Sequence, residues 1–171
     1  SHELKTPLFA AQGFIHTLVD GADQDPKVRK NFLTKAARAL DNLEALVQDI
    51  LKLSQIESGE IRMKMEPVDM AELAESEAEA CRPMADKKKI ELIVKKSKNA
   101  AISMADRKWI GQVIRNLLSN AVSYSPENTR VLVSVQTTKK SVVTTVLDHG
   151  EGIPEEHLGR IFERFYRVDK S

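Results

Sequence analysis

The clearest chemical pattern in the chain lies at its start, where a histidine and an acidic residue are adjacent. Residues 1–8 read Ser-His-Glu-Leu-Lys-Thr-Pro-Leu, and a helix over this stretch puts His2 and Thr6 one turn apart on one face. Imidazole titrates near neutral pH. If the Glu3 carboxylate takes the Nδ1 proton, the other ring nitrogen is free to act as a nucleophile. The alternative is a solvated surface pair, with Pro7 only marking a helix start.

A second polar pattern lies in a helix predicted over residues 106–122. Asn116, Asn120 and Ser123 follow one another at i, i+4 and i+7 beside an apolar stripe. Asparagine is a weak helix former, and its amide oxygen is a hard ligand suited to a Mg²⁺ ion that also holds phosphate oxygens. The alternative is a polar helix face that makes ordinary surface hydrogen bonds.

A third pattern begins directly after a predicted strand near the end of the chain. Residues 148–152 read Asp-His-Gly-Glu-Gly. A carboxylate there can accept a hydrogen bond from an exocyclic amine such as that of adenine, and glycine lets the backbone approach a ligand closely. Residues 161–167 then place arginines, which suit bidentate phosphate contacts, among aromatic residues. A plain turn and a short helix with packing aromatics are the alternatives.

Two helices with a repeating apolar seam are expected to position the histidine. Their apolar residues recur at alternating spacings of 3 and 4, which is typical of a coiled-coil seam. The seam residues are Leu4, Leu8, Ala11, Ile15 and Leu18, then Leu33, Ala36, Leu40, Leu43, Val47 and Ile50 in a second helix over 27–56. A polar turn over 21–26 joins the helices into an antiparallel hairpin. Because one hairpin buries only part of its seam, we expect a second copy to complete a four-helix bundle as a homodimer.

After Ser58-Gly59 the pattern changes to that of an α/β domain, which makes the whole chain α+β. We expect a solvated loop over 87–89 and a loop without periodicity over 148–171. The predicted strands and helices follow in chain order: strand 61–67, a helix capped by Asp69 and running to about 85, strands 90–94 and 101–104, helix 106–122, and a hairpin of strands 131–135 and 142–147.

Composition excludes several classes of function. The chain has 171 residues, of which 42% are hydrophobic and 30% charged, and its net charge is +1. This balance indicates neither a nucleic-acid partner nor direct contact with an anionic membrane. One cysteine, Cys81, and scattered histidines give no ligand spacing for a metal such as zinc. No apolar run approaches the roughly 18 residues of a transmembrane helix. The sequence begins inside its first motif, so we expect a piece of a longer protein.

The four motifs occur in the order that is typical of one family. Residues 1–8 resemble the H box, 116–121 the N box, 148–152 the G1 box and 162–166 the F box of the sensor histidine kinases of two-component systems. The resemblance covers essentially the whole chain. It implies a dimerisation and histidine-phosphotransfer hairpin over 1–57 and a catalytic ATP-binding domain over 58–171, an α/β sandwich of the gyrase and Hsp90 type.

The resemblance also implies roles in phosphotransfer. His2 would be the phosphoacceptor that attacks the γ-phosphate of ATP, with Glu3 as its base. Thr6 would position water to dephosphorylate the partner, the receiver domain of a response regulator. The parent protein would lie in the bacterial inner membrane with this part in the cytoplasm.

The same resemblance assigns the nucleotide site. Asn120 would be a Mg²⁺ ligand, with Asn116 supporting the metal or its water. Asp148 would accept a hydrogen bond from the adenine amine, and Tyr124 would flank the base. Gly150 and Gly152 would give the backbone of the ATP lid its conformational freedom, and Arg167 would reach the phosphates.

The chain departs from the family at two points. Ser123 stands where many relatives have a basic residue, and the sequence ends before the Gly-rich G2 box that closes the lid. The function expected is ATP-dependent autophosphorylation of His2 and phosphoryl transfer to a regulator aspartate. A dimeric phosphotransfer scaffold without effective ATP turnover is the alternative. An ATPase of the gyrase or Hsp90 kind would need an acidic residue at 116 to activate water, and Asn116 argues against it.

Overall fold

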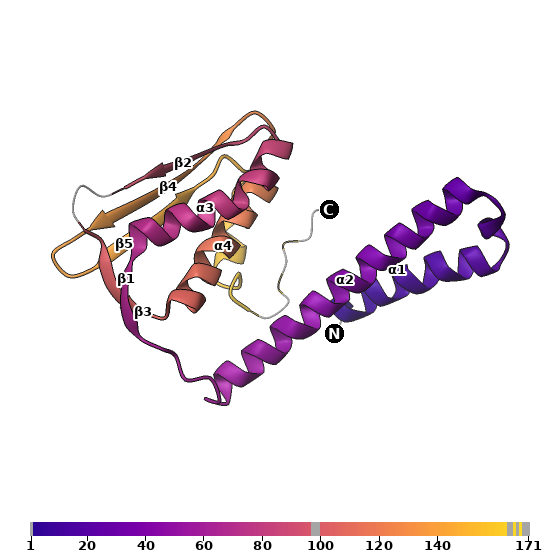
Figure 1. Cartoon of the computed structure of the whole chain (residues 1–171), viewed down its shortest axis with the longest axis horizontal. Helices are drawn as coiled ribbons and strands as arrows, with labels where there is room; N and C mark the ends of the chain where they lie inside the picture. The colour runs from indigo at the N-terminus through magenta and orange to yellow at the C-terminus, as the bar shows by residue number, and fades with distance from the viewer. Residues whose placement is uncertain (1, 97–99, 164–165, 167, 169–171) are drawn as a thin grey trace. The chain divides into compact units, whose positions relative to one another are not determined.

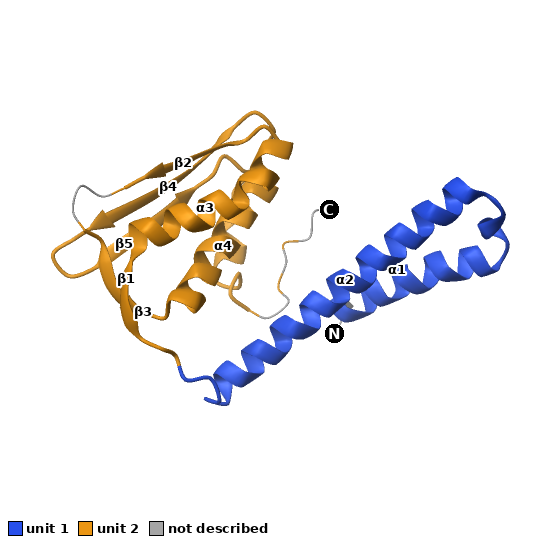
Figure 2. Cartoon of the chain, viewed as in Figure 1, with its two compact units in different colours: residues 1–62 blue, residues 63–171 orange. Residues whose placement is uncertain are grey.

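The computed structural model describes residues 2–96, 100–163, 166 and 168, with the backbone alone for His2. It divides the chain into two compact units, residues 1–62 and 63–171 (Figure 2). In the described part of the chain, no helix is both long enough and apolar enough to cross a membrane.

The first unit is the predicted antiparallel hairpin. Helix α1 spans His2–Val19, a short 3-10 helix spans Ala22–Gln24, and helix α2 spans Pro26–Glu57 (Figure 1). The turn is possible because Gly21 takes a positive φ of 108°. Asp25 then caps α2 by accepting a hydrogen bond of 2.8 Å from the backbone N–H of Lys27.

The predicted seam is divided between two faces of the hairpin. The residues that α1 and α2 bury against each other are mostly small: Ala11, Leu18, Ala36 and Ala39. The other half of the seam faces outward. On α2, Leu33, Leu40 and Val47 recur every seven residues and are 53%, 45% and 41% exposed. An apolar stripe with heptad spacing therefore remains on the outside of the isolated hairpin.

The second unit contains two small sheets. Strands β1 (Glu66–Asp69) and β3 (Ile102–Ala105) pair antiparallel. Strand β4 (Arg130–Thr137) lies between β2 (Glu91–Lys95), with which it is parallel, and β5 (Val142–Leu147), with which it is antiparallel. The predicted hairpin of the last two strands is confirmed. The first predicted strand was placed too early, because extended pairing begins only at Glu66.

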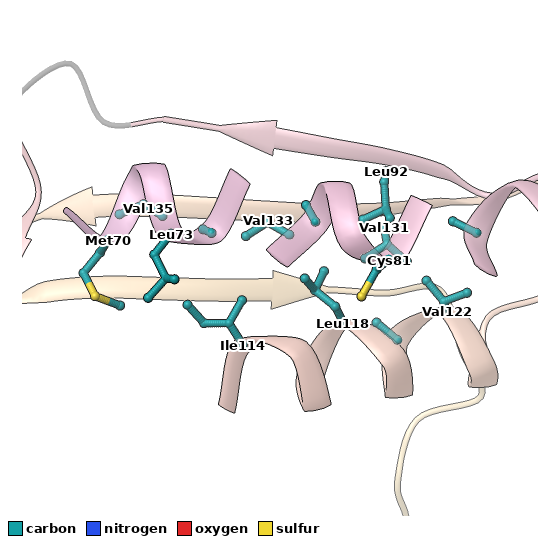
Figure 3. Close-up of a cluster of buried hydrophobic side chains, with 14 of the residues drawn as sticks. Met70, Leu73, Cys81, Leu92, Ile114, Leu118, Val122, Val131, Val133 and Val135 are labelled. Atoms are coloured by element: carbon teal, nitrogen blue, oxygen red, sulfur yellow. The ribbon is translucent and has the colours of Figure 1, made fainter. Parts of the chain in front are cut away.

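Two helices cover one face of the larger sheet. These are α3 (Met70–Lys87) and α4 (Arg107–Tyr124), and a short helix α5 (Glu155–Leu158) follows β5 (Figure 1). Figure 3 shows their apolar side chains meeting those of the strands. The core includes Leu73 and Ala78 of α3, Ile114, Leu118 and Val122 of α4, and Val131, Val133 and Val135 of β4. The last three alternate along the strand and so point to the face that the helices cover.

An ion pair joins α3 and α4, with its carboxylate buried and its guanidinium about half exposed. The guanidinium of Arg115 donates to both carboxylate oxygens of Glu77, over 2.7 and 3.1 Å, and the Glu77 side chain is only 10% exposed. Gly111 leaves room for this carboxylate, since a Cβ there would lie 2.9 Å from Glu77 Oε1. This bidentate pairing sets how α4 packs on α3.

The packing of the core predicts that two adjacent leucines of α4 contribute very differently to the free energy of unfolding. Leu118 is fully buried and Leu117 is 47% exposed. Leu118→Ala should lower the free energy of unfolding by about 2–5 kcal/mol, because it leaves a cavity. Leu117→Ala, the matched control, should lower it by less than about 1 kcal/mol. Urea unfolding followed by the fluorescence of Trp109, the one tryptophan of the chain, measures both. Equal losses would contradict the packing of α4.

Candidate functional site

The polar face of α4 carries the two predicted asparagines. Its apolar face is held in the core, so Asn116 and Asn120, one turn apart, are exposed on the other side. Gln112 Nε2 donates to Asn116 Oδ1 over 3.1 Å. This bond aims the amide oxygen of Asn116 along the helix and leaves it a second lone pair for another partner.

The end of α4 meets the turn that follows β5. Asp148 Oδ1 accepts a hydrogen bond of 2.7 Å from the backbone N–H of Gly150. A Cβ at Gly150 would lie 3.1 Å from the carbonyl oxygen of Tyr124 and 2.9 Å from Asp148 Oδ1. Three of the predicted site residues, which come from two distant parts of the sequence, are therefore brought together. Asn120 lies one turn before Tyr124 on the same helix.

A buried serine fastens this junction. Ser125 is 2% exposed, and its Oγ accepts a hydrogen bond of 3.3 Å from the backbone N–H of His149. Its own N–H donates to Ala121 O over 3.1 Å and closes the last turn of α4. Sequence reasoning did not single out Ser125, although a Ser-Pro step at a helix end is a recognisable turn signal.

Backbone freedom is needed at the second glycine of the turn. Gly152 has a φ of 76°, which residues with a Cβ rarely adopt. Tyr124, predicted to flank a base, is 58% exposed at the end of α4. The ring of Tyr124 is thus open to solvent while its main chain is held against Gly150.

The aromatic segment near the end of the chain forms a local cluster. His157 Nδ1 and the hydroxyl of Tyr166 are hydrogen-bonded, and the guanidinium of Arg160 lies 4.2 Å from the centre of the Tyr166 ring. Arg160 also pairs with Glu163, with Nη2 3.0 Å from Oε2. Phe162 is 93% exposed. The predicted phosphate contact, Arg167, lies outside the described residues.

The predicted phosphotransfer residues lie at the start of α1. Glu3 is half-buried and Thr6 is exposed, and the helix continues through Pro7. His2 is the first residue of this helix, and its side chain lies outside the described part. Along the helix backbone, positions 2 and 6 are one turn apart.

A carboxylate, that of Asp106, caps the start of α4. The Asp106 carboxylate accepts bonds from the N–H groups of Lys64, Lys108 and Trp109, over 2.8, 3.0 and 3.2 Å. These donors, Lys64 first, hold the pKa of Asp106 below its ordinary value, so this cap stays ionised. Burial raises the pKa of the Cys81 thiol, and the charge of Glu77 raises it further, so less of this residue is present as the reactive thiolate.

Among the described residues, no three His, Cys, Asp or Glu side chains gather closely enough to hold a metal ion. The polar face of α4 offers the amide oxygens of Asn116 and Asn120. Mg²⁺ typically takes one or two protein oxygens and completes its shell with water and phosphate. The donor set of α4 therefore fits a Mg²⁺ ion that arrives with a phosphorylated ligand.

Two family models match parts of the chain. Residues 1–59 match the His Kinase A (phospho-acceptor) domain family, and residues 105–171 match the family described as histidine kinase-, DNA gyrase B-, and HSP90-like ATPase. The chain is 30% identical over 173 residues to the sensor histidine kinase WalK of Bacillus subtilis, and 34% identical over 174 residues to the sensor protein CreC of Escherichia coli. Both alignments cover 100% of this chain, but only 28% of WalK and 35% of CreC.

A solved structure extends the likeness to both units. The histidine kinase ThkA, in complex with the response regulator protein TrrA, matches with a TM-score of 0.83 and 26% sequence identity. The match covers 97% of this chain and 48% of that one.

The junction predicts that position 150 tolerates no side chain. Gly150→Ala should push the turn away from Tyr124 O and break the bond between Asp148 Oδ1 and the amide of residue 150. Hydrogen exchange of that amide should then accelerate about tenfold, as expected for a loss of about 1.4 kcal/mol. Gly159→Ala is the matched control, because a Cβ there meets nothing within 4 Å. An unchanged exchange rate at residue 150 would disprove the close approach.

Proposed function

Because the chain belongs to the sensor histidine kinases of two-component systems, we propose that it catalyses ATP-dependent autophosphorylation of His2. The phosphoryl group then passes to an aspartate of a response-regulator receiver domain. In this proposal residues 1–57 form the dimerisation and phosphotransfer domain, and residues 58–171 form the catalytic ATP-binding domain.

One observation carries the proposed ATP site, namely the packing of the end of α4 against the Asp148–Gly150 turn. Tyr124 O lies 3.1 Å from where a Cβ of Gly150 would be, so Asp148 and the exposed Tyr124 ring border the same junction. A carboxylate there suits the exocyclic amine of adenine, and the ring suits its face. In this proposal, Gly150 and Gly152 let the following segment move over the triphosphate, and Arg167 contacts the phosphates.

The asparagines of α4 are proposed to hold Mg²⁺ with the nucleotide. Asn120 is the ligand, and Asn116 supports the metal or its water. When bound, Mg²⁺ neutralises charge on the phosphate oxygens. The support for this role is the pair of exposed amide side chains, which lie one turn apart on α4.

The proposed chemistry at His2 is an in-line displacement. One imidazole nitrogen forms a bond to the γ-phosphorus as the bond from that phosphorus to the ADP oxygen breaks. Glu3 accepts the proton from the other ring nitrogen, so the ring remains a good nucleophile. In the second step the N–P bond breaks as a carboxylate oxygen of the regulator forms a bond to phosphorus. Thr6 is proposed to orient water when the regulator is dephosphorylated.

The partners proposed are a second copy of this chain and a response regulator. The outer stripe of Leu33, Leu40 and Val47 would be covered in a four-helix bundle. The regulator is proposed because the similar kinase ThkA is found in complex with one. The chain spans 28% of the length of WalK and 35% of the length of CreC. From the family resemblance we further propose that its parent is a bacterial inner-membrane sensor, with this part in the cytoplasm.

Labelled ATP tests the kinase proposal directly. Incubation with γ-labelled ATP and Mg²⁺ should give an acid-labile, base-stable label that His2→Ala abolishes. His16→Ala is the matched control, since His16 is an exposed histidine of the same helix, and it should keep the label. Label on another residue would refute the role of His2. A dimer that binds a receiver domain but takes up no label would support the scaffold alternative.

Replacing Thr6 should slow dephosphorylation of the regulator but not autophosphorylation. Thr6→Ala should leave autophosphorylation within about twofold and slow dephosphorylation of a phosphorylated receiver domain by about tenfold or more, as expected when a water-positioning group is lost. Thr6→Ser, which keeps a hydroxyl, should recover most of the rate. The control is Thr17→Ala, because the Thr17 hydroxyl bonds only locally, to Gly13 O over 2.8 Å. Equal losses of both activities in Thr6→Ala would contradict the assigned role.

A further inference from the structure

A lysine from the turn after α3 donates to the end of α4. Lys88 Nζ donates hydrogen bonds to three backbone carbonyl oxygens, over 3.0 Å to Val122, 2.8 Å to Ser123 and 2.8 Å to Ser125. The run of lysines over 87–89 predicts a solvated loop, but the Lys88 side chain is half-buried. The correction has a tertiary cause, since its acceptors lie 34 to 37 residues further along the chain.

The backbone around Lys88 is held as firmly as its ammonium group. Its N–H donates to Ala85 O over 3.0 Å, and its carbonyl accepts from the N–H of Asn128 over 3.3 Å. Lys89 takes the left-handed conformation, with a φ of 55°, and the chain then enters β2. The backbone of Lys88 is thus fixed by hydrogen bonds, and its side chain reaches directly from there to the end of α4.

The position of this charge suits a helix C-terminus. The last carbonyls of a helix lack partners within the helix and carry the negative end of its dipole. A lysine side chain that donates to several of them at once satisfies these acceptors and offsets that dipole. Lys88 therefore satisfies carbonyl groups at the C-terminal end of α4.

This end of α4 is also the junction of the proposed adenine site. Ser125 accepts from Lys88 through its carbonyl, and from the His149 N–H through its Oγ, over 3.3 Å. One residue before it, Tyr124 presents its carbonyl to Gly150. We infer that Lys88 is a positioning residue for adenine recognition, acting through Ser125 to hold Tyr124 against the Asp148–Gly150 turn. This inference rests on the proposed ATP-binding function.

The test compares two nucleotides in the full chain. Lys88→Met keeps the aliphatic stem but loses the three donors. We expect the Kd for ATP to rise about tenfold, a change of about 1.4 kcal/mol, while the Kd for GTP, which lacks the amine at that ring position, changes by less than about twofold. Lys88→Arg, which keeps a cation, should recover most of the ATP preference. Lys87→Met is the matched control, since Lys87 is the exposed neighbour in the last turn of α3.

If Lys88 contributed only to stability, Lys88→Met would raise the Kd for ATP and the Kd for GTP by the same factor. That result would overturn the inference. If Lys88→Met fails to fold, Ser125→Ala replaces it, because it removes the acceptor for the His149 N–H and leaves the Ser125 carbonyl in place. Ser125→Ala should lower the ATP preference in the same way. An unchanged ratio of the two Kd values in the variant that folds would refute the positioning role.

A second measurement separates this inference from the proposed function. Hydrogen exchange of the His149 amide needs no nucleotide, and it should accelerate about tenfold in Lys88→Met but not in Lys87→Met. If the unmodified chain does not bind ATP, the proposed function fails, and the His149 amide still decides whether Lys88 holds the junction. An unchanged exchange rate overturns the link from Lys88 to the turn.

Discussion

The placement of helix α4 is the constraint on which the rest of the second unit depends. One face of this helix packs into the core through Ile114, Leu118 and Val122, so its opposite face must be exposed. The asparagines stand on that exposed face. Because a packed helix can neither slide nor rotate without opening a cavity, the core fixes the height and direction of the polar side chains. The site is therefore as rigid as the packing beneath it.

Both ends of α4 are held by charges that complement its dipole. Asp106 caps the first turn and also accepts from the Lys64 N–H, which joins the helix to the strand region before β1. Lys88 donates to the last carbonyls. A carboxylate at the N-terminus and an ammonium at the C-terminus are each the favourable sign. The pair formed by Glu77 and Arg115 adds a third attachment between the ends, and so the helix is fixed along its length.

The hairpin follows a different principle, since half of its apolar seam is exposed within the described part of this unit. Small residues such as Ala36 and Ala39 let α1 and α2 approach closely, while Leu40 and Val47 stay outside. Large apolar side chains at heptad spacing are typical of a helix that packs on two sides. The proposed dimerisation would follow from how the seam is divided, and a phosphoacceptor at the start of α1 would then be carried on a four-helix scaffold.

The sequence by itself determined most of the elements and their caps, because helix and strand periodicity and the capping by Asp69 and Asp106 are local. The prediction was wrong for the first strand, which begins later, and for the loop over 148–171, where the short helix α5 forms. It also identified the family, since four motifs in one order are specific even though each alone is weak. It could not place Lys88, Ser125 or the pairing of Glu77 with Arg115, which have no local signal. A run of lysines predicts a solvated loop whether or not the folded chain brings backbone carbonyls within reach of one of them. Which half of the hairpin seam is buried was likewise decided by the tertiary structure. Long-range packing brings these groups to partners far away in the chain, and only there does their chemistry become defined.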